Sequence, residues 1–192
     1  MPASKWRSIC YSNYPPVEIL GPDDTALKVP CRSPLIIVDA IKPYIENKIV
    51  CEIGSACGDI AIRMKKYAKY VFGIEIDRKR AEYSKKRGLD TRLANALDIF
   101  PLSENIDVYL MWIYPHVARD IFNMIDRGVV IMSELSNGAN KVDYEQEFKI
   151  FLELHKEFPN SRMLEIEYNE GKGEGESGIM VLLTVDKGKK TS

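Results

Sequence analysis

The chain has 192 residues, enough for one well-buried core and short for two, so we expect a single domain. Its 27 basic and 28 acidic residues give a formal net charge of −1, which excludes bulk attraction to nucleic acid or to an anionic membrane. No apolar run approaches the roughly 18 residues of a membrane span, and the N-terminus lacks the apolar core of a signal peptide. We therefore expect a cytoplasmic protein.

Four cysteines without a Cys-x-x-Cys pair, and only two histidines, argue for reduced thiols and against a metal site.

In chain order, residues 1–32 come first, and they are rich in aromatic residues and prolines without clear periodicity. We expect an irregular arm there, and it is the leading candidate for a substrate lid. Ser33 before Pro34 predicts a helix start, and Pro43 within the apolar pattern that follows predicts a kink or an end. Strand and helix patterns then alternate, with strands expected at 49–53, 70–76, 91–94, 106–112 and 128–133, and helices at 58–69, 78–87, 116–126 and 142–157.

The predicted strands are nearly continuous apolar runs, which is typical of a parallel sheet covered by helices on both faces. The last two, 162–168 and 178–185, have no helix between them, and so short a link requires antiparallel pairing. The sequence therefore predicts an α/β sandwich of three layers over residues 33–186. Its sheet is expected to be mostly parallel and seven-stranded, with an antiparallel C-terminal hairpin. The tail, residues 187–192, is expected to be disordered.

The segment from Ile49 to Asp77 carries most of the functional information, because it reads as a strand, a small-residue turn, a helix and a second strand that ends in an acid. Gly54 and Gly58 allow a sharp turn and let a ligand lie against bare backbone. Glu75 follows Gly54 by 21 residues (75 − 54), the separation at which a carboxylate meets a ribose diol held by such a turn. The pattern predicts a nucleoside-binding βαβ unit.

The turn helps to decide which nucleoside is bound. Dinucleotide folds bind pyrophosphate through Gly-x-Gly-x-x-Gly at a helix N-terminus, whereas here Gly54 and Gly58 are four residues apart and Asp59 follows. A carboxylate on the first helical turn would repel pyrophosphate and attract the ammonium group of an amino-acid ligand. A ligand with a ribose and a cationic tail is therefore favoured over NAD.

Over residues 49–135 the chain resembles the class I S-adenosylmethionine-dependent methyltransferases, and the predicted hairpin fits the reversed last strand of that Rossmann-like family. Four segments resemble its motifs in order: Glu52-Ile-Gly54-Ser-Ala-Cys-Gly58, Gly73-Ile-Glu75-Ile-Asp77, Ala94-Asn95-Ala96-Leu97-Asp98 and Met111-Trp112-Ile113-Tyr114-Pro115-His116. One departure is mild, since Ala56 stands where a second glycine is most usual. The resemblance implies S-adenosylmethionine as cofactor and methyl transfer as the reaction.

The resemblance also implies which residues form the site. Glu75 would hold the ribose, Asn95 would meet the adenine amino group, and the Ala96 backbone would meet the ring edge. Trp112 is expected beside the donor methyl, because aromatic faces attract a cationic sulfur, although a pure packing role is an equal alternative. The implied cofactor-binding set is Glu52, Gly54, Ala56, Cys57, Gly58, Glu75, Ile76, Asn95, Ala96 and Trp112.

Catalysis of methyl transfer needs little side-chain chemistry, since the barrier falls mainly through alignment and exclusion of water. If the acceptor must lose a proton, His116 is the best-placed base and Glu134 the second, with Tyr114 expected near the transferred methyl. A histidine at the start of a helix is also common without a catalytic role. The methyl acceptor, its reacting atom and the oligomeric state stay open.

Basic residues are concentrated in one segment, since residues 59–90 hold ten Lys and Arg against five acids. The two helices predicted there share a positive character. An RNA-directed methyltransferase is therefore an alternative to one acting on a small molecule or another exposed macromolecular group, although such residues are usually only solvated. A second alternative is a module that keeps the fold and binds a cofactor or a partner without turnover.

Overall fold

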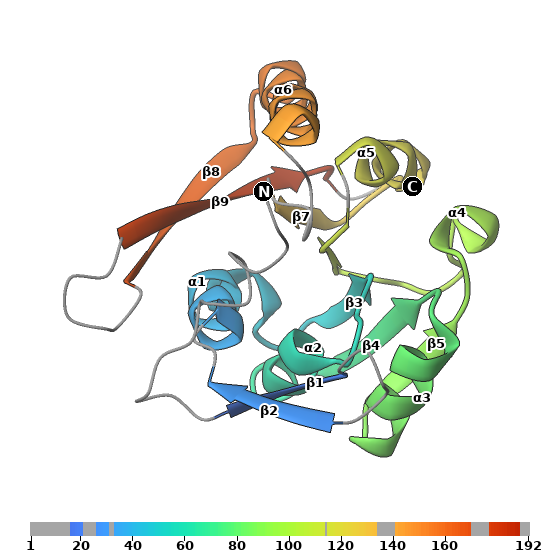
Figure 1. Ribbon diagram of the computed structural model, residues 1–192. Coiled ribbons are helices and arrows are strands. Elements are labelled where there is room, and N and C mark those ends of the chain that lie inside the picture. The colour runs from blue at the N-terminus through green and yellow to red at the C-terminus, as the bar shows by residue number, and fades with distance from the viewer. Residues whose placement is uncertain are drawn as a thin grey trace.

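The computed structural model describes residues 16–20, 26–30, 33–113, 115–133, 141–169 and 177–188 (Figure 1). In these ranges the main sheet contains β3 (Ile49–Ile53), β4 (Tyr70–Glu75), β5 (Asp90–Leu93), β6 (Val108–Met111), β7 (Val129–Ser133), β8 (Arg162–Asn169) and β9 (Ser177–Asp186). The helices are α1 (Ser33–Ile45), α2 (Asp59–Met64), α3 (Arg78–Lys86), α4 (Ala96–Ile99), α5 (Pro115–Met124) and α6 (Lys141–Glu157). A separate pair of strands comprises β1 (Pro16–Leu20) and β2 (Ala26–Pro30). Within the described ranges, no helix has the length and apolar character needed to cross a membrane.

The main sheet has the strand order β5-β4-β3-β6-β7-β9-β8. The first five of these strands are parallel, and β9 runs antiparallel to both β7 and β8. The predicted fold class is therefore confirmed, including the C-terminal hairpin. After β5 the chain crosses back to the other side of β3, so the strand order reverses between β3 and β6. Open α/β sheets bind ligands outside the carboxyl ends of the strands at such a point.

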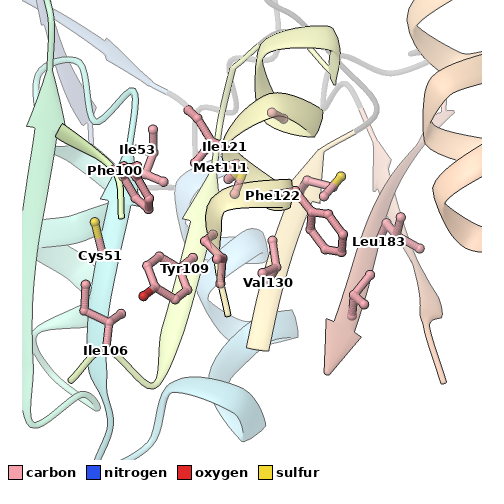
Figure 2. Packing of buried hydrophobic residues seen from close by; sticks show 14 of the residues in the cluster. Cys51, Ile53, Phe100, Ile106, Tyr109, Met111, Ile121, Phe122, Val130 and Leu183 are labelled. Atoms are coloured by element: carbon pink, nitrogen blue, oxygen red, sulfur yellow. The ribbon is translucent and has the colours of Figure 1, made fainter. Parts of the chain in front are cut away.

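Alternate residues of the strands face two different helix layers. Cys51, Tyr109 and Val130 pack with side chains of α5 and α6, and Figure 2 shows this cluster. Leu110 and Ile131, which follow Tyr109 and Val130 in the chain, pack with α1 and α2 on the opposite face. Both faces of the sheet are thus buried, which explains why the strands read as continuous apolar runs.

Two helices end at positions other than those predicted. α1 continues through Pro43, which lies in its last turn, where the missing amide interrupts only the helix end. The helix predicted over 58–69 already ends at Met64, because the chain must reverse to place β4 beside β3. The Lys69 amide closes that reversal by donating to the Lys48 carbonyl at 2.9 Å.

The expectation of an irregular arm is wrong for part of residues 1–32. β1 and β2 pair antiparallel, with Pro16 opposite Pro30 at one end of the ladder. Prolines are tolerated at strand ends, where their missing amide disturbs the ladder least, so their presence did not exclude strands. The other residues of the arm lie outside the described ranges, and the lid role stays a prediction.

The first two residues of the predicted disordered tail are held in place. The Lys187 ammonium donates to the backbone carbonyl of Phe122 at 2.6 Å and lies 3.9 Å from the centre of the Phe122 ring. Partial burial lowers the pKa of Lys187. The Gly188 carbonyl accepts from the Gly128 amide at 3.2 Å. The expectation of disorder is therefore wrong for Lys187 and Gly188, and residues 189–192 lie outside the described ranges.

Replacing Phe122 by Ala should lower the free energy of unfolding by about 3–5 kcal/mol. Its ring is fully buried and meets the Phe158 ring edge-on, with 4.9 Å between ring centres, so truncation leaves a cavity in the layer under α5. Urea denaturation would measure the change. Met124→Ala on the same helix is the matched control, because that side chain is partly exposed and should cost far less. Equal losses in the two variants would contradict this placement of the core.

Candidate functional site

The turn between β3 and α2, residues 54–58, has an unusual backbone. Gly54, Ala56 and Gly58 all have positive φ, at 76°, 46° and 79°. This conformation costs nothing for glycine and strains alanine modestly, so the structure explains why a glycine is usual at the position of Ala56. A Cβ atom on Gly58 would lie 2.6 Å from Ser84 Oγ. The absence of a side chain at Gly58 therefore lets α3 pack against the turn.

Gly54 lies directly beneath the segment that follows β6. A Cβ atom there would lie 2.4 Å from Ile113 Cγ2 and 3.2 Å from the Trp112 carbonyl oxygen. The Trp112 amide in turn donates to the Ile53 carbonyl at 3.1 Å. The first and fourth motifs therefore meet at the point where the strand order reverses. The sequence predicted no role for Ile113, because Gly54, which it contacts, lies far from it in the chain.

Glu75, at the end of β4, connects its strand to this turn. One carboxylate oxygen accepts from the Ala56 amide at 2.7 Å, and the other accepts from the Asp77 amide at 2.8 Å. The side chain is only 5% exposed and is directed at the turn, not at bulk water. Each carboxylate oxygen can accept more than one hydrogen bond, so capacity for hydroxyl donors remains. Glu75 thus holds the backbone of the turn, a role that the sequence did not reveal.

Glu52 caps the helix that follows the turn. Its Oε2 accepts from the Ala61 amide of α2 at 3.2 Å, and the residue is 2% exposed. Burial raises the pKa of Glu52 well above its usual range, although the bond from Ala61 opposes the shift. The nearby charges of Asp59 and Glu75 raise it further. The side chain predicted to face the ligand therefore makes its one described hydrogen bond to α2.

Asp59 does not present an isolated charge to the turn. Its carboxylate pairs with Arg87 at 2.8 Å, and Arg63 lies 3.6 Å from the same oxygen. Arg87, at the end of α3, also donates to the Cys57 carbonyl at 2.7 Å. The interpretation that Asp59 repels pyrophosphate as a bare carboxylate is therefore weakened, because the two guanidinium groups offset its charge. Arg87 was missed because it lies 28 residues away in the chain.

The third predicted motif lies beside Glu75. The Ala94 amide donates to the Glu75 carbonyl at 3.0 Å, which joins the ends of β5 and β4. Asn95 caps the short helix α4, which the sequence did not predict, by accepting from the Leu97 amide at 3.2 Å. Ala96 begins that helix and is half-buried. The implied contacts of Asn95 and Ala96 with an adenine ring stay predictions.

Two apolar side chains are exposed next to these polar groups. Ile76, directly after Glu75, is 68% exposed, and Leu93, at the end of β5, is 39% exposed. Ile76 belongs to the predicted cofactor-binding set. Leu93 was missed, because a leucine at the end of a strand is expected to be buried in the core. Flat apolar ligands bind such surfaces readily.

A hollow of about 620 Å³ lies at the opposite end of the sheet, where β7 begins. It is lined by Tyr44, Val129, Pro159, Asn160, Ser161, Arg162, Thr184, Asp186 and Gly188. None of the predicted site residues that the structure describes lies there. The residues of the four motifs instead gather at the carboxyl ends of β3, β4, β5 and β6, so the candidate site is at that edge.

No protein-family model matches the sequence, and no curated protein sequence matches it. Solved structures do match. A putative O-methyltransferase from Klebsiella pneumoniae superposes with a TM-score of 0.58 at 17% identity, covering 87% of this chain and 84% of that one. The O-methyltransferase TomG from Streptomyces achromogenes, in complex with S-adenosylmethionine, gives 0.57 at 16% identity, covering 86% and 83%. A putative RNA methyltransferase from Pyrococcus horikoshii gives 0.54 at 14% identity, covering 96% and 99%.

The chain has the fold of the class I S-adenosylmethionine-dependent methyltransferases. In this methyltransferase fold, two further predicted cofactor residues, Cys57 within the turn and Trp112 after β6, differ in exposure. Cys57 is buried and forms no disulfide. Trp112 is half-buried and packs with the cluster that contains α1 and α2, which agrees with its packing alternative. A contact between Trp112 and a transferred methyl stays a prediction.

The predicted catalytic residues of the methyltransferase fold are only partly described. His116 is exposed on the first turn of α5, at the same edge of the sheet as the turn. Tyr114 and Glu134 lie outside the described residues. In the part of the chain that the structure describes, no group of three or more His, Cys, Asp or Glu is placed to hold a metal ion.

Replacing Gly54 by Ala should destabilise the fold by about 1–3 kcal/mol, because the new Cβ would meet Ile113 and the φ of 76° disfavours a side chain. Thermal and urea unfolding of Gly54→Ala, Ile113→Ala and the double variant would test this in a double-mutant cycle. Truncating the Ile113 side chain should recover the part of the lost unfolding free energy that comes from the clash with the new Cβ. Strictly additive losses would show that the two residues do not touch.

Proposed function

We propose that the protein is an S-adenosylmethionine-dependent methyltransferase, acting on a small molecule or on an exposed group of a macromolecule. The observation that carries the proposal is the placement of the Glu75 carboxylate. It lies against the β3–α2 turn, which follows one of the two strands between which the strand order reverses. The backbone carbonyl of the same residue accepts from the Ala94 amide, just before α4. A ribose diol is the group that such a carboxylate binds in nucleoside-binding folds.

The residues at this edge fit an adenosyl cofactor. Glu75 offers acceptor capacity for two adjacent hydroxyls, and Ile76 and Leu93 offer apolar contact for a purine ring. Together, Glu75, Ile76 and Leu93 support a nucleoside in the crevice, with its sugar toward β4.

The N-terminus of α2 argues against a dinucleotide. A Rossmann pyrophosphate site needs amides at the helix start that are free to bind phosphate oxygens. Here the Glu52 carboxylate accepts from the Ala61 amide, so an acidic side chain already takes that place. The preference against NAD therefore rests on Glu52 more than on Asp59, whose charge Arg87 offsets.

The chain's own residues would align the reactants and exclude water. The cofactor, when bound, supplies an electrophilic methyl group. Ile113 and the half-buried Trp112 cover the turn from the side of β6 and limit access of water to it. His116, on the first turn of α5, is the residue that we propose as base for an acceptor that must lose a proton. Tyr114 and Glu134 keep their predicted roles.

Isothermal titration with S-adenosylmethionine, S-adenosylhomocysteine and NAD tests the cofactor. We expect one molecule of either sulfur compound to bind and NAD not to bind. Binding of NAD without a response to S-adenosylmethionine would overturn the proposal. Incubation with methyl-labelled cofactor and a cell extract, followed by separate nuclease and protease digestion, would then show the class of acceptor. Cofactor binding without any transfer would favour the alternative of a module without turnover.

Replacing Glu75 by Gln should weaken binding of S-adenosylmethionine by about 1.5–3 kcal/mol, because one charge-assisted contact to the ribose is lost. That is roughly 10- to 150-fold in Kd. The amide of Gln would also face an amide donor, either Ala56 or Asp77, so the unfolding temperature should fall as well. Calorimetry well below that temperature separates the two effects.

The matched control for that variant is Glu82→Gln on α3, which removes the same charge from an exposed side chain. It should leave both affinity and stability unchanged. An unchanged affinity in Glu75→Gln would show that the ribose does not lie there. Glu75→Ala is a poorer choice than the isosteric change, because it would leave two backbone amides without their acceptor.

A further inference from the structure

We propose that one exposed surface, which we call the basic face, binds single-stranded RNA through its phosphates. The basic face is formed by α3 and by the turn between α2 and β4. Its cations are all exposed, and they are Lys65, Lys66, Lys69, Arg78, Lys79, Arg80, Lys85 and Lys86. This inference goes beyond the proposed methyl transfer, since it concerns a surface outside the crevice and does not depend on the cofactor.

The structure separates these cations from the basic residues that serve the fold. Arg63 and Arg87, the other two of the ten in this segment, are largely buried against Asp59 and offset its charge. The Lys65 ammonium donates to the Gly88 carbonyl at 2.8 Å, which brings the turn after α2 against the end of α3. The exposed cations of the turn therefore adjoin those in the last turn of α3.

Among the described residues, the cations of the basic face outnumber the acids that lie on or beside it. Asp77 caps α3 by accepting from the Arg80 amide at 2.9 Å, Asp90 accepts from the Tyr70 hydroxyl, and Glu82 lies exposed within α3. A surface with this excess of positive charge attracts polyanions by releasing their condensed counterions.

The first turn of α3 carries charges that the helix dipole disfavours. Arg78, Lys79 and Arg80 occupy the first turn, where the helix dipole disfavours positive charge, and no acid stands in that turn. A bound polyanion would remove this conflict, since its phosphates would screen the three cations. The same turn begins three residues after Glu75, so that end of the basic face adjoins the candidate cofactor site.

Aromatic rings are interleaved with the cations, as in surfaces that bind single-stranded nucleic acid. The Tyr67 ring has the Lys66 ammonium 5.3 Å from its centre and the Lys42 ammonium of α1 at 5.0 Å. Tyr83, on α3, has the Arg87 guanidinium 5.8 Å from its ring centre. Lys42 therefore extends the positive surface toward α1.

An anionic membrane is the other polyanion to weigh. A helix that lies in a membrane interface needs an exposed apolar face to insert. The large apolar side chains found exposed among the described residues are Tyr70, Ile76, Leu93 and Met124, and none of them lies on α3. Ala81 of α3 is instead buried toward the sheet. Helix α3 thus offers charge without an apolar face to insert, which favours RNA.

Fluorescence anisotropy with a labelled single-stranded RNA of mixed sequence, measured without cofactor, tests the proposal. Two double variants neutralise the face: Lys85→Gln with Lys86→Gln, and Arg78→Gln with Arg80→Gln. Each should weaken binding about tenfold, and each should reduce the slope of log K against log salt by about 1.4, since each phosphate contact contributes roughly 0.7. Lys149→Gln with Lys156→Gln on α6 removes the same charge from another exposed surface and should change nothing.

Thermal unfolding of all variants checks that they fold, and calorimetry with S-adenosylmethionine checks the crevice separately. RNA binding that is absent, or equal in wild type and both face variants, would overturn the proposal. So would binding to phosphatidylserine vesicles in place of RNA. Because the RNA assay contains no cofactor, its failure would leave the proposed methyltransferase function untouched, and failure of cofactor binding would leave the RNA result standing.

Discussion

The candidate site depends on one interaction, the pair of hydrogen bonds that the Glu75 carboxylate accepts from the amides of Ala56 and Asp77. Ala56 has a positive φ, which an alanine adopts only when the surroundings compensate for the strain. A charge-assisted bond to its amide is such a compensation. The same side chain thus fixes the backbone of the turn and lies at the end of β4, where a ligand would bind. A substitution of Glu75 would therefore change the geometry of the turn together with its capacity to bind a ligand.

Around this carboxylate, the acidic residues on either side of the turn bind other groups of the protein. Glu52 is bonded to the start of α2, and Asp59 is paired with Arg87 from the end of α3. Burial keeps the pKa of Glu52 high, so its charge is costly as well as enclosed. Selection of a ligand at this edge therefore follows from shape and from which amides are occupied. The negative charge beside the turn contributes less to that selection than the sequence alone indicates.

Local pattern was sufficient to predict the layers and the mostly parallel sheet with its antiparallel hairpin, because buried parallel strands read as apolar runs and a short link forces the last pair antiparallel. The spacing of Gly54 and Glu75 predicted that these two residues meet, and the family resemblance added Asn95 to the same site. It could not predict the contact of Ile113 with Gly54 or of Arg87 with Asp59. Those contacts join residues far apart in the sequence, and a local sequence pattern does not show that such residues meet in the folded protein.

Helix α3 joins the two surfaces to which function is assigned. Its N-cap, Asp77, donates its amide to Glu75 and accepts from the Arg80 amide, so the Glu75 carboxylate and the first basic turn of α3 are joined through one residue. At the other end, Arg87 anchors the helix to the β3–α2 turn. Both ends of α3 are therefore bonded to residues of the candidate site, while its exposed cations face away from it. One helix thus supports the turn and carries the basic face.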